Sequence, residues 1–270
     1  MRGMTRGWGI ATLEPDLSDR AVRSGLHPGA LAVLDARGIR GEAGLREHLD
    51  TRADDLLDPY EIHGMKRAVA RIHRAITDKE PVMVLGDYDV DGTCGAALTT
   101  HMLRALGARV TPRIAERLED GYGLSPRAVA RVLAEKPKVL ICVDHGINAV
   151  GPVAELRAAG IDTVICDHHL PGPEVPDAAA ILDPAVQGVD APGRALCGAG
   201  VAMKLMWALA AAAGPARREE LGPVLLRTLA LAAVATVADL VPLDLENRRI
   251  VRLGLRAIAG AGPVGLRALA

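Results

Sequence analysis

Short apolar runs alternate with helical patterns through the middle of the sequence. The segments between the runs repeat apolar residues every three or four positions, as helices do. Strands that are apolar throughout are covered on both faces, as in a parallel sheet between two helical layers. The predicted strands are Val82–Leu85, Arg109–Thr111, Val139–Val143, Thr163–Cys166 and Ala179–Leu182, and the helices between them are Cys94–Leu106, Ser125 to about Glu135, and Val150–Ala159. The pattern predicts a doubly wound α/β fold with a mainly parallel sheet and helices on both faces.

Helical patterns also occupy both ends of the sequence. Before the first strand they cover His27–Gly38 and Asp58–Ile76. Beyond Asp190 they cover about Gly200–Ala213, Val224–Ala238 and Asn247–Ala259. We therefore expect a helical and loop segment over 1–77, an α/β domain over 78–245, and the beginning of a connector helix over 246–270.

The composition is that of a soluble globular protein, with half of the residues hydrophobic and 24% charged. With no Phe, three Tyr and two Trp, few rings are present on which bases could stack. The formal net charge of −1 gives no global attraction to nucleic acid, so binding of phosphates would depend on local arginines.

The four cysteines are widely separated, and their spacing indicates neither a disulfide framework nor a zinc site. Met1–Gly9 lacks the apolar region of a secretory signal, and the apolar run Thr228–Ala238 is too short to span a bilayer. These features predict a cytoplasmic protein with no membrane partner.

Acidic and imidazole side chains follow three of the predicted strands. They are Asp87, Asp89 and Asp91 after the first strand, Asp144 and His145 after the next, and Asp167, His168 and His169 after the third. Because parallel strands end at the same edge of a sheet, these groups should converge there. Clustered carboxylates repel one another unless cations neutralise them, and oxygen ligands with imidazole suit Mn²⁺ or Mg²⁺. The sequence therefore predicts a divalent-metal site.

Two other interpretations apply to the first acidic segment. Asp87 to Gly92 matches the start of a calcium-binding loop, but the twelfth position is Leu98 instead of Glu. The segment from Asp89 to Thr93 is also similar to the nucleophile motif of haloacid-dehalogenase-type phosphatases, in which Asp89 would attack phosphorus and Asp91 would act as acid and base. That interpretation leaves Asp167, His168 and His169 without a role.

Five segments, in this order along the chain, resemble RecJ-type exonucleases of the DHH phosphoesterase superfamily. They are Val84–Gly92, Glu119–Leu124, Cys142–Ile147, Asp167–Pro171 and Thr236–Leu243. The resemblance extends from about Leu31 to the end of the chain. It implies a DHH phosphoesterase domain over 78–245 and a metal-dependent, 5′-to-3′ exonuclease that hydrolyses single-stranded DNA in repair and recombination.

The resemblance also implies the roles of individual residues. Two ions, Mn²⁺ or Mg²⁺, would be held by Asp89, Asp91, Asp144, His168 and Asp239, with Asp144 between them. His169 would contact the scissile phosphate or the attacking water, and Asp87 would be a further acid beside the metals. Asp239 belongs to this set through the resemblance alone, since by sequence it is equally a helix-terminal acid.

Arg113, Arg117 and Tyr122 precede the helix that begins near Ser125 and are candidates for binding the DNA strand. They are equally consistent with ordinary surface positions. His145 occupies a position that is often Cys or Asn in the family, and it could support the ligands from behind.

Members of the family continue into a second, substrate-gripping domain, whereas this sequence stops at Ala270. Two expectations follow. The chain is either the catalytic half of the exonuclease, with single-stranded DNA and a missing C-terminal substrate-binding domain as its partners, or a truncated metal-binding module with little nuclease activity of its own.

Overall fold

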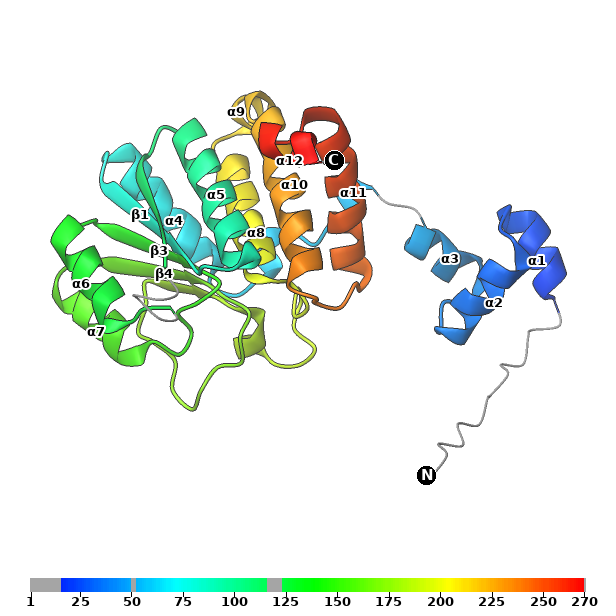
Figure 1. Cartoon of the computed structure of the whole chain (residues 1–270), viewed down its shortest axis with the longest axis horizontal. Coiled ribbons are helices and arrows are strands. Elements are labelled where there is room, and N and C mark those ends of the chain that lie inside the picture. The colour runs from blue at the N-terminus through cyan, green and yellow to red at the C-terminus, as the bar shows by residue number, and fades with distance from the viewer. Residues whose placement is uncertain (1–15, 50–51, 116–122, 270) are drawn as a thin grey trace. The chain divides into compact units, whose positions relative to one another are not determined.

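A computed structural model describes residues 16–49, 52–115 and 123–269 of the chain (Figure 1). By its internal contacts the chain divides into two compact units, Met1–Thr51 and Arg52–Ala270. The two units are described separately. Among the described residues, no helix combines the length and the apolar character needed to cross a bilayer.

The first unit contains three short helices, α1 (Leu17–Ser24), α2 (Pro28–Ala36) and α3 (Gly41–Leu49). Leucines from all three helices form its small core. Arg20 of α1 donates two hydrogen bonds of 2.7 and 2.9 Å to Asp35 of α2. The hydrogen bonds from Arg20 also hold the pKa of Asp35 below its usual value. This buried, bidentate pair joins the first two helices.

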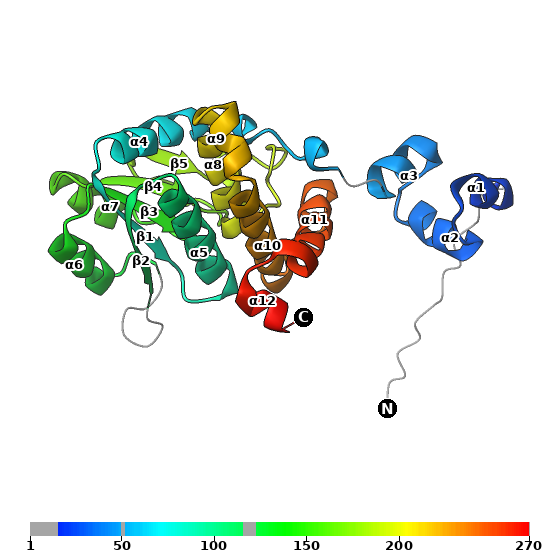
Figure 2. The same cartoon turned by 90° about the horizontal axis from the view of Figure 1, so that it is seen from above.

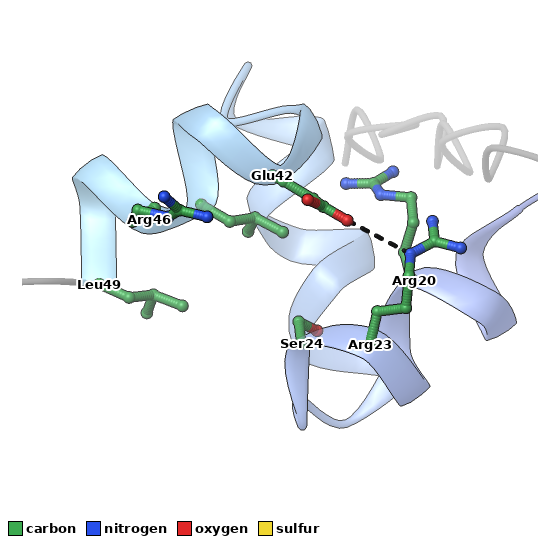
Figure 3. A pocket seen from close by; sticks show the side chains of 7 residues that line it. Arg20, Arg23, Ser24, Glu42, Arg46 and Leu49 are labelled. Carbon is green, nitrogen blue, oxygen red and sulfur yellow. Dashed lines mark ion pairs between the residues drawn. The ribbon is translucent and has the colours of Figure 1, made fainter.

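A pocket of about 250 Å³ lies among these helices (Figure 3). At its edge, Arg23 Nε lies 3.4 Å from Glu42 Oε1, and Arg46 approaches from α3. Glu42 thus pairs with Arg23, and Asp35 pairs with Arg20.

The second unit is built on a five-stranded sheet in the order β2-β1-β3-β4-β5. All of its neighbouring strands are parallel. The strands are β1 (Pro81–Gly86), β2 (Arg109–Ile114), β3 (Val139–Val143), β4 (Asp162–Cys166) and β5 (Ala180–Leu182). The expected parallel α/β fold is confirmed, and each predicted strand overlaps an observed one.

Alternate residues of each strand contribute to opposite faces of the sheet. Val82 and Val84 of β1 pack with α4 (Met65–Thr77), α5 (Val90–Ala105), α8 (Gly198–Ala212) and α10 (Gly222–Ala238). Met83 and Leu85 pack with α6 (Pro126–Glu135) and α7 (Val150–Ala158). Figures 1 and 2 show these two helical layers with the strands between them. Because both faces of the inner strands β1 and β3 are covered, these two strands are apolar along their whole length.

The remaining elements connect or extend this core. They are the short 3-10 helices η1 (Ala53–Asp55), η2 (Pro59–Glu61) and η3 (Pro184–Gln187), and the helices α9 (Pro215–Glu220), α11 (Leu245–Ala261) and α12 (Val264–Leu269). The pattern did not predict α1, α3, α9 or α12 as separate helices. Helix α11 packs along α10. The expected division into a helical segment (1–77), a DHH domain (78–245) and a connector helix (246–270) stays a prediction.

The prediction of a single helix over Asp58–Ile76 is wrong for residues 58–64, where the chain forms η2 and then turns. Gly64 has a φ of +80°, and an added Cβ would lie 2.3 Å from the carbonyl oxygen of Ile181. This close approach to β5 and the left-handed backbone require glycine. Helix α4 therefore begins at Met65.

A buried ion pair connects α8, α11 and the segment that precedes η2. Lys204 Nζ lies 2.5 Å from Glu246 Oε1 and donates to the carbonyl oxygen of Leu57 at 2.7 Å. Glu246 Oε2 accepts from the N–H of Leu57 at 3.0 Å. Burial lowers the pKa of Lys204, and Glu246 opposes that shift. The pair thus satisfies the backbone N–H and carbonyl groups of Leu57, which lies outside the sheet.

We predict that Lys204→Met destabilises the chain by about 3–5 kcal/mol, because it leaves the Glu246 carboxylate without its cation. The double variant Lys204→Met, Glu246→Leu should lose less, since it removes both charges. Urea unfolding of the two single variants and the double variant measures the coupling. Additive losses would contradict a direct interaction.

Candidate metal centre

The predicted site residues lie where the direction of strand addition reverses. Strand β1 lies between β2 and β3, so the connections that leave β1 and β3 run to opposite sides. Parallel sheets of this order bind ligands at the carboxyl end of that switch point. Asp87 and Asp89 follow β1, and Asp144 follows β3.

Asp89 and Asp91 are oriented by helix N-termini. Asp89 caps α5, its Oδ1 accepting from the N–H of Gly92 at 2.9 Å. The buried Asp91 accepts from the N–H groups of Gly198 at 2.6 Å and Ala199 at 2.8 Å, which open α8. Backbone N–H groups at a helix start favour a carboxylate. Their positions therefore hold Asp91 in a fixed orientation.

Asp144 ends β3 in a strained backbone conformation. Its φ is +67°, a region that non-glycine residues rarely adopt, and its side chain is buried. Burial raises its pKa to about 10, and the neighbouring carboxylates of Asp91 and Asp89 act in the same direction. Without a cation this carboxyl group is held in its neutral form.

His168 points its Nε2 at three carboxylates. The atom lies 3.2 Å from Asp144 Oδ1, 3.7 Å from Asp239 Oδ2 and 3.8 Å from Asp91 Oδ2. His168 Nε2 and Asp239 Oδ2 are buried, yet they make no hydrogen bond within the described part of the chain. Buried polar atoms without partners are costly, so their convergence fits a bound cation.

Asp167 organises the loop after β4. Its carboxylate accepts from the N–H groups of Ile147 at 2.9 Å and His168 at 2.8 Å, and from His169 Nδ1 at 2.7 Å. Burial alone would raise the pKa of Asp167, but these hydrogen bonds lower it to about 2. The hydrogen bond to Asp167 raises the pKa of His169. The hydrogen bond from His169 Nδ1 to Asp167 fixes the orientation of the imidazole ring beside the cluster.

The candidate ligands form three overlapping groups whose ligand atoms lie within 4.8 Å of one another. The groups are Asp144, His168 and His169; Asp91, His168 and Asp239; and Asp87, Asp89 and Asp144. The structure thus brings together seven residues singled out in the sequence. Oxygen ligands with imidazole fit Mn²⁺ or Mg²⁺.

Asp239 closes this group from the end of α10. It is the residue after the last turn of that helix, so it is both a helix-terminal acid and a neighbour of His168. Burial raises its pKa, while His168 lowers it and Asp91 raises it.

Of the residues proposed to bind the DNA strand, Arg113 lies within the described part of the chain and pairs with an acid outside the ligand groups. Arg113 makes two hydrogen bonds of 2.8 and 2.9 Å to Glu135 of α6. Arg117 and Tyr122 lie outside the described residues. His145 is buried, with its Nε2 3.1 Å from the carbonyl oxygen of Leu85, and burial lowers its pKa to about 4. His145 therefore links β1 and β3 as a neutral ring.

Sequence reasoning missed the role of Gly198, because the helix there was expected to begin at Gly200. An added Cβ at Gly198 would lie 2.7 Å from Asp144 Cα. Asp183 was also missed, although it follows β5 as the other acids follow their strands. Burial raises its pKa to about 6, and its Oδ1 accepts from the N–H of Ala185 at 2.8 Å. It caps η3 behind the centre.

The fold and the cluster define an α/β protein with carboxylates and imidazoles that could hold a divalent cation at the switch point of a parallel sheet. Residues 81–236 match the description "DHH family, N-terminal domain", and the chain belongs to the DHH family. This confirms the family inferred from the ordered segments of the sequence.

The chain is similar to proteins named RecJ. It is 39% identical over 242 residues to the single-stranded-DNA-specific exonuclease RecJ of Bacillus subtilis, a match that covers 90% of this chain and 29% of the relative. RecJ of Thermus thermophilus in complex with Mn²⁺ superposes with a TM-score of 0.75 at 32% identity, covering 96% of this chain and 36% of that one. The Mg²⁺ complex of RecJ from the same organism superposes with a TM-score of 0.63 at 27% identity, covering 96% of this chain and 32% of that one. The chain therefore spans about a third of the length of these relatives.

We predict a pH-dependent exchange of a proton for a metal ion at Asp144. Its raised pKa means that the neutral form is favoured in the folded, metal-free chain. Stability should therefore fall as the pH rises from about 4, the value of a free Asp, toward 10. Asp144→Asn should remove part of this loss and also weaken Mn²⁺ binding. Melting temperatures of both chains in EDTA, and Mn²⁺ titrations at several pH values, measure the effect. Wild-type Mn²⁺ affinity that does not rise with pH would contradict it.

We also predict that Gly198→Ala displaces Asp144 or α8, destabilising the chain by about 1–3 kcal/mol and weakening Mn²⁺ binding. Gly151→Ala is the matched control, because nothing lies within 4 Å of its added Cβ. The control should keep Mn²⁺ binding and stabilise α7 by up to about 1 kcal/mol. Equal behaviour of the two variants in thermal unfolding and Mn²⁺ titration would rule out the close contact.

Proposed function

We propose that the chain carries the hydrolytic centre of a metal-dependent exonuclease that cleaves single-stranded DNA from the 5′ end. The observation that carries the proposal is the overlap of the ligand groups: one group shares His168 with the second group and Asp144 with the third. Overlapping groups suit two neighbouring cations better than one. The similarity to RecJ exonucleases supports the same substrate and the same role in repair and recombination.

In this proposal the three groups divide the ligands between two sites. Asp91, His168 and Asp239 would hold one ion, Asp87 and Asp89 would serve the other, and Asp144 would contribute to both. Bound Mn²⁺ or Mg²⁺ supplies an activated water and stabilises the attacking and leaving oxygens of a phosphodiester. The hydrogen bonds from α8 keep Asp91 aimed at the site before any ion binds.

His169 is proposed to bind the scissile phosphate. Its Nδ1 is occupied by Asp167, and its raised pKa favours a positive charge next to an anionic substrate. Half-buried at the edge of the cluster, it can reach a ligand that enters from solvent. Asp87 is proposed to accept a proton near the second ion, since burial raises the pKa of this carboxyl group.

The observed contacts favour this function over a phosphatase with Asp89 as nucleophile. Asp89 caps α5, and the residues that such a phosphatase would leave idle, His168 and His169, lie within the ligand groups. The similarity to full-length exonucleases likewise favours a catalytic domain over a metal-binding module without nuclease activity.

The test replaces His168. His168→Ala should lower Mn²⁺ affinity by about 100-fold or more, because losing a ligand costs at least as much as losing its supporting partner. Hydrolysis of a 5′-phosphorylated single strand should be lost with it. His73→Ala, an exposed histidine on α4, is the control and should change neither property. Isothermal titration with Mn²⁺ and release of nucleotides are the two measurements.

Normal hydrolysis in the His168 variant, or a covalent phosphate trapped on Asp89, would overturn the proposal in favour of the phosphatase mechanism. Mn²⁺ binding without hydrolysis in the wild-type chain would favour the metal-binding module.

A further inference from the structure

A cleft of about 630 Å³ opens directly beside the metal centre. His168 forms one part of its lining, so the cleft reaches the proposed metal ligands. The remaining lining comes from the loop before α8, residues 189–196, and from the turn between α10 and α11, residues 241–244. Neither segment was given a function by the sequence analysis or by the metal site.

The two walls of this cleft are held together by one buried side chain. Asn247 Nδ2 donates to the carbonyl oxygen of Ala195 at 2.6 Å and to that of Pro242 at 2.8 Å. Its own N–H donates to Asp244 Oδ1 at 2.9 Å, which caps α11. Ala195, Pro242 and Asp244 all line the cleft. The cleft is therefore formed before a ligand arrives, which lowers the cost of binding.

Arg194 supplies the positive charge of this cleft. It is the Lys or Arg among the described residues that line the cleft, and within the described ranges its guanidinium makes no ion pair or hydrogen bond. Its backbone is fixed by a turn in which its N–H donates to the carbonyl oxygen of Ala191 at 3.0 Å. Asp244, one of the acids in the lining, is already engaged as a helix cap.

The position of Arg194 relates it to the metal centre. Burial raises the pKa of Asp183, and Arg194 and His168 both act in the opposite direction on that carboxyl group. Arg194 and His168 also line the same cleft. Because the centre is strongly acidic and the chain has a net charge of −1, a strand of phosphates needs local cations such as this one.

We propose that this cleft is a nucleotide subsite, in which Arg194 binds a backbone phosphate next to the scissile one. The inference rests on the proposed function and adds a substrate contact to it. A planar guanidinium donates two parallel hydrogen bonds to a phosphate, which explains a half-buried arginine whose side chain has no partner among the described residues. Val241 and Pro242 offer an apolar wall for the sugar or base of the same nucleotide.

The experiment measures the salt dependence of DNA binding by the full chain. A 5′-phosphorylated oligothymidylate with a 3′ fluorophore is titrated with protein, with Ca²⁺ in place of Mn²⁺ to suppress cleavage, at salt concentrations from very low to physiological. Arg194→Gln should weaken binding about tenfold at low salt. It should also reduce the slope of log K against log salt by about 0.7, the contribution of one phosphate on a single strand.

Two further variants separate charge from structure. Arg194→Lys should keep the salt slope and recover part of the affinity, since it retains the charge but not the paired hydrogen bonds. Arg256→Gln removes an exposed arginine of α11 that does not line the cleft, and it should match the wild type. Mn²⁺ affinity should be the same in all four proteins, because Arg194 does not contact the ions.

An unchanged slope and affinity in Arg194→Gln would overturn the subsite, as would a loss of Mn²⁺ affinity, which would indicate a structural role. No measurable binding by the wild-type chain at low salt would overturn it too. Competition by thymidine 5′-monophosphate that disappears in Arg194→Gln would support a subsite for a single nucleotide. The proposed function fails separately, through hydrolysis that survives His168→Ala.

Discussion

The contact between Asp91 and the first turn of α8 joins the two halves of the metal centre. Asp91 lies in the first turn of α5, and its partners Gly198 and Ala199 follow more than a hundred residues later. Two short hydrogen bonds from backbone N–H groups compensate the burial of this carboxylate. They also bring Gly198 against the backbone of Asp144. The ligands from β1 and β3 thus depend on a helix that contributes no ligand itself.

The same arrangement makes the metal-free centre unfavourable. Several carboxylates converge around Asp144, whose backbone is strained and whose charge is suppressed. Such strain persists where the surrounding fold determines it fully. Here β3 is hydrogen-bonded on both sides, by β1 and β4, and α8 covers its end. The stability of the sheet and its helices offsets the free-energy cost of this strained and crowded site.

Much of this organisation was predictable from the sequence, because strand tips have a strong local signature. The apolar runs that lead to Asp87, Asp144 and Asp167 were enough to predict that these acids meet at one edge of the sheet. They were also enough to predict that a divalent cation could bind there. The break of the helix at Gly64 was not predictable, because its cause is the carbonyl group of Ile181, distant in the sequence. The role of Asp91 as a cap for α8 was hidden for the same reason. Asp239 required the family resemblance, since no local pattern distinguishes it from an ordinary helix end.

The pairing of Lys204 with Glu246 has a mechanical consequence for the centre. Helix α11 begins at the wall of the cleft that adjoins His168, and Glu246 and Arg249 fasten its first two turns to Leu57 and Asp55. Tension applied to the chain at Arg52 is therefore resisted by α8 and α11 through a buried charge pair. The strands that carry the ligands lie beyond this anchor. A pull on the residues before Leu57 would have to break this pair before it reached those strands.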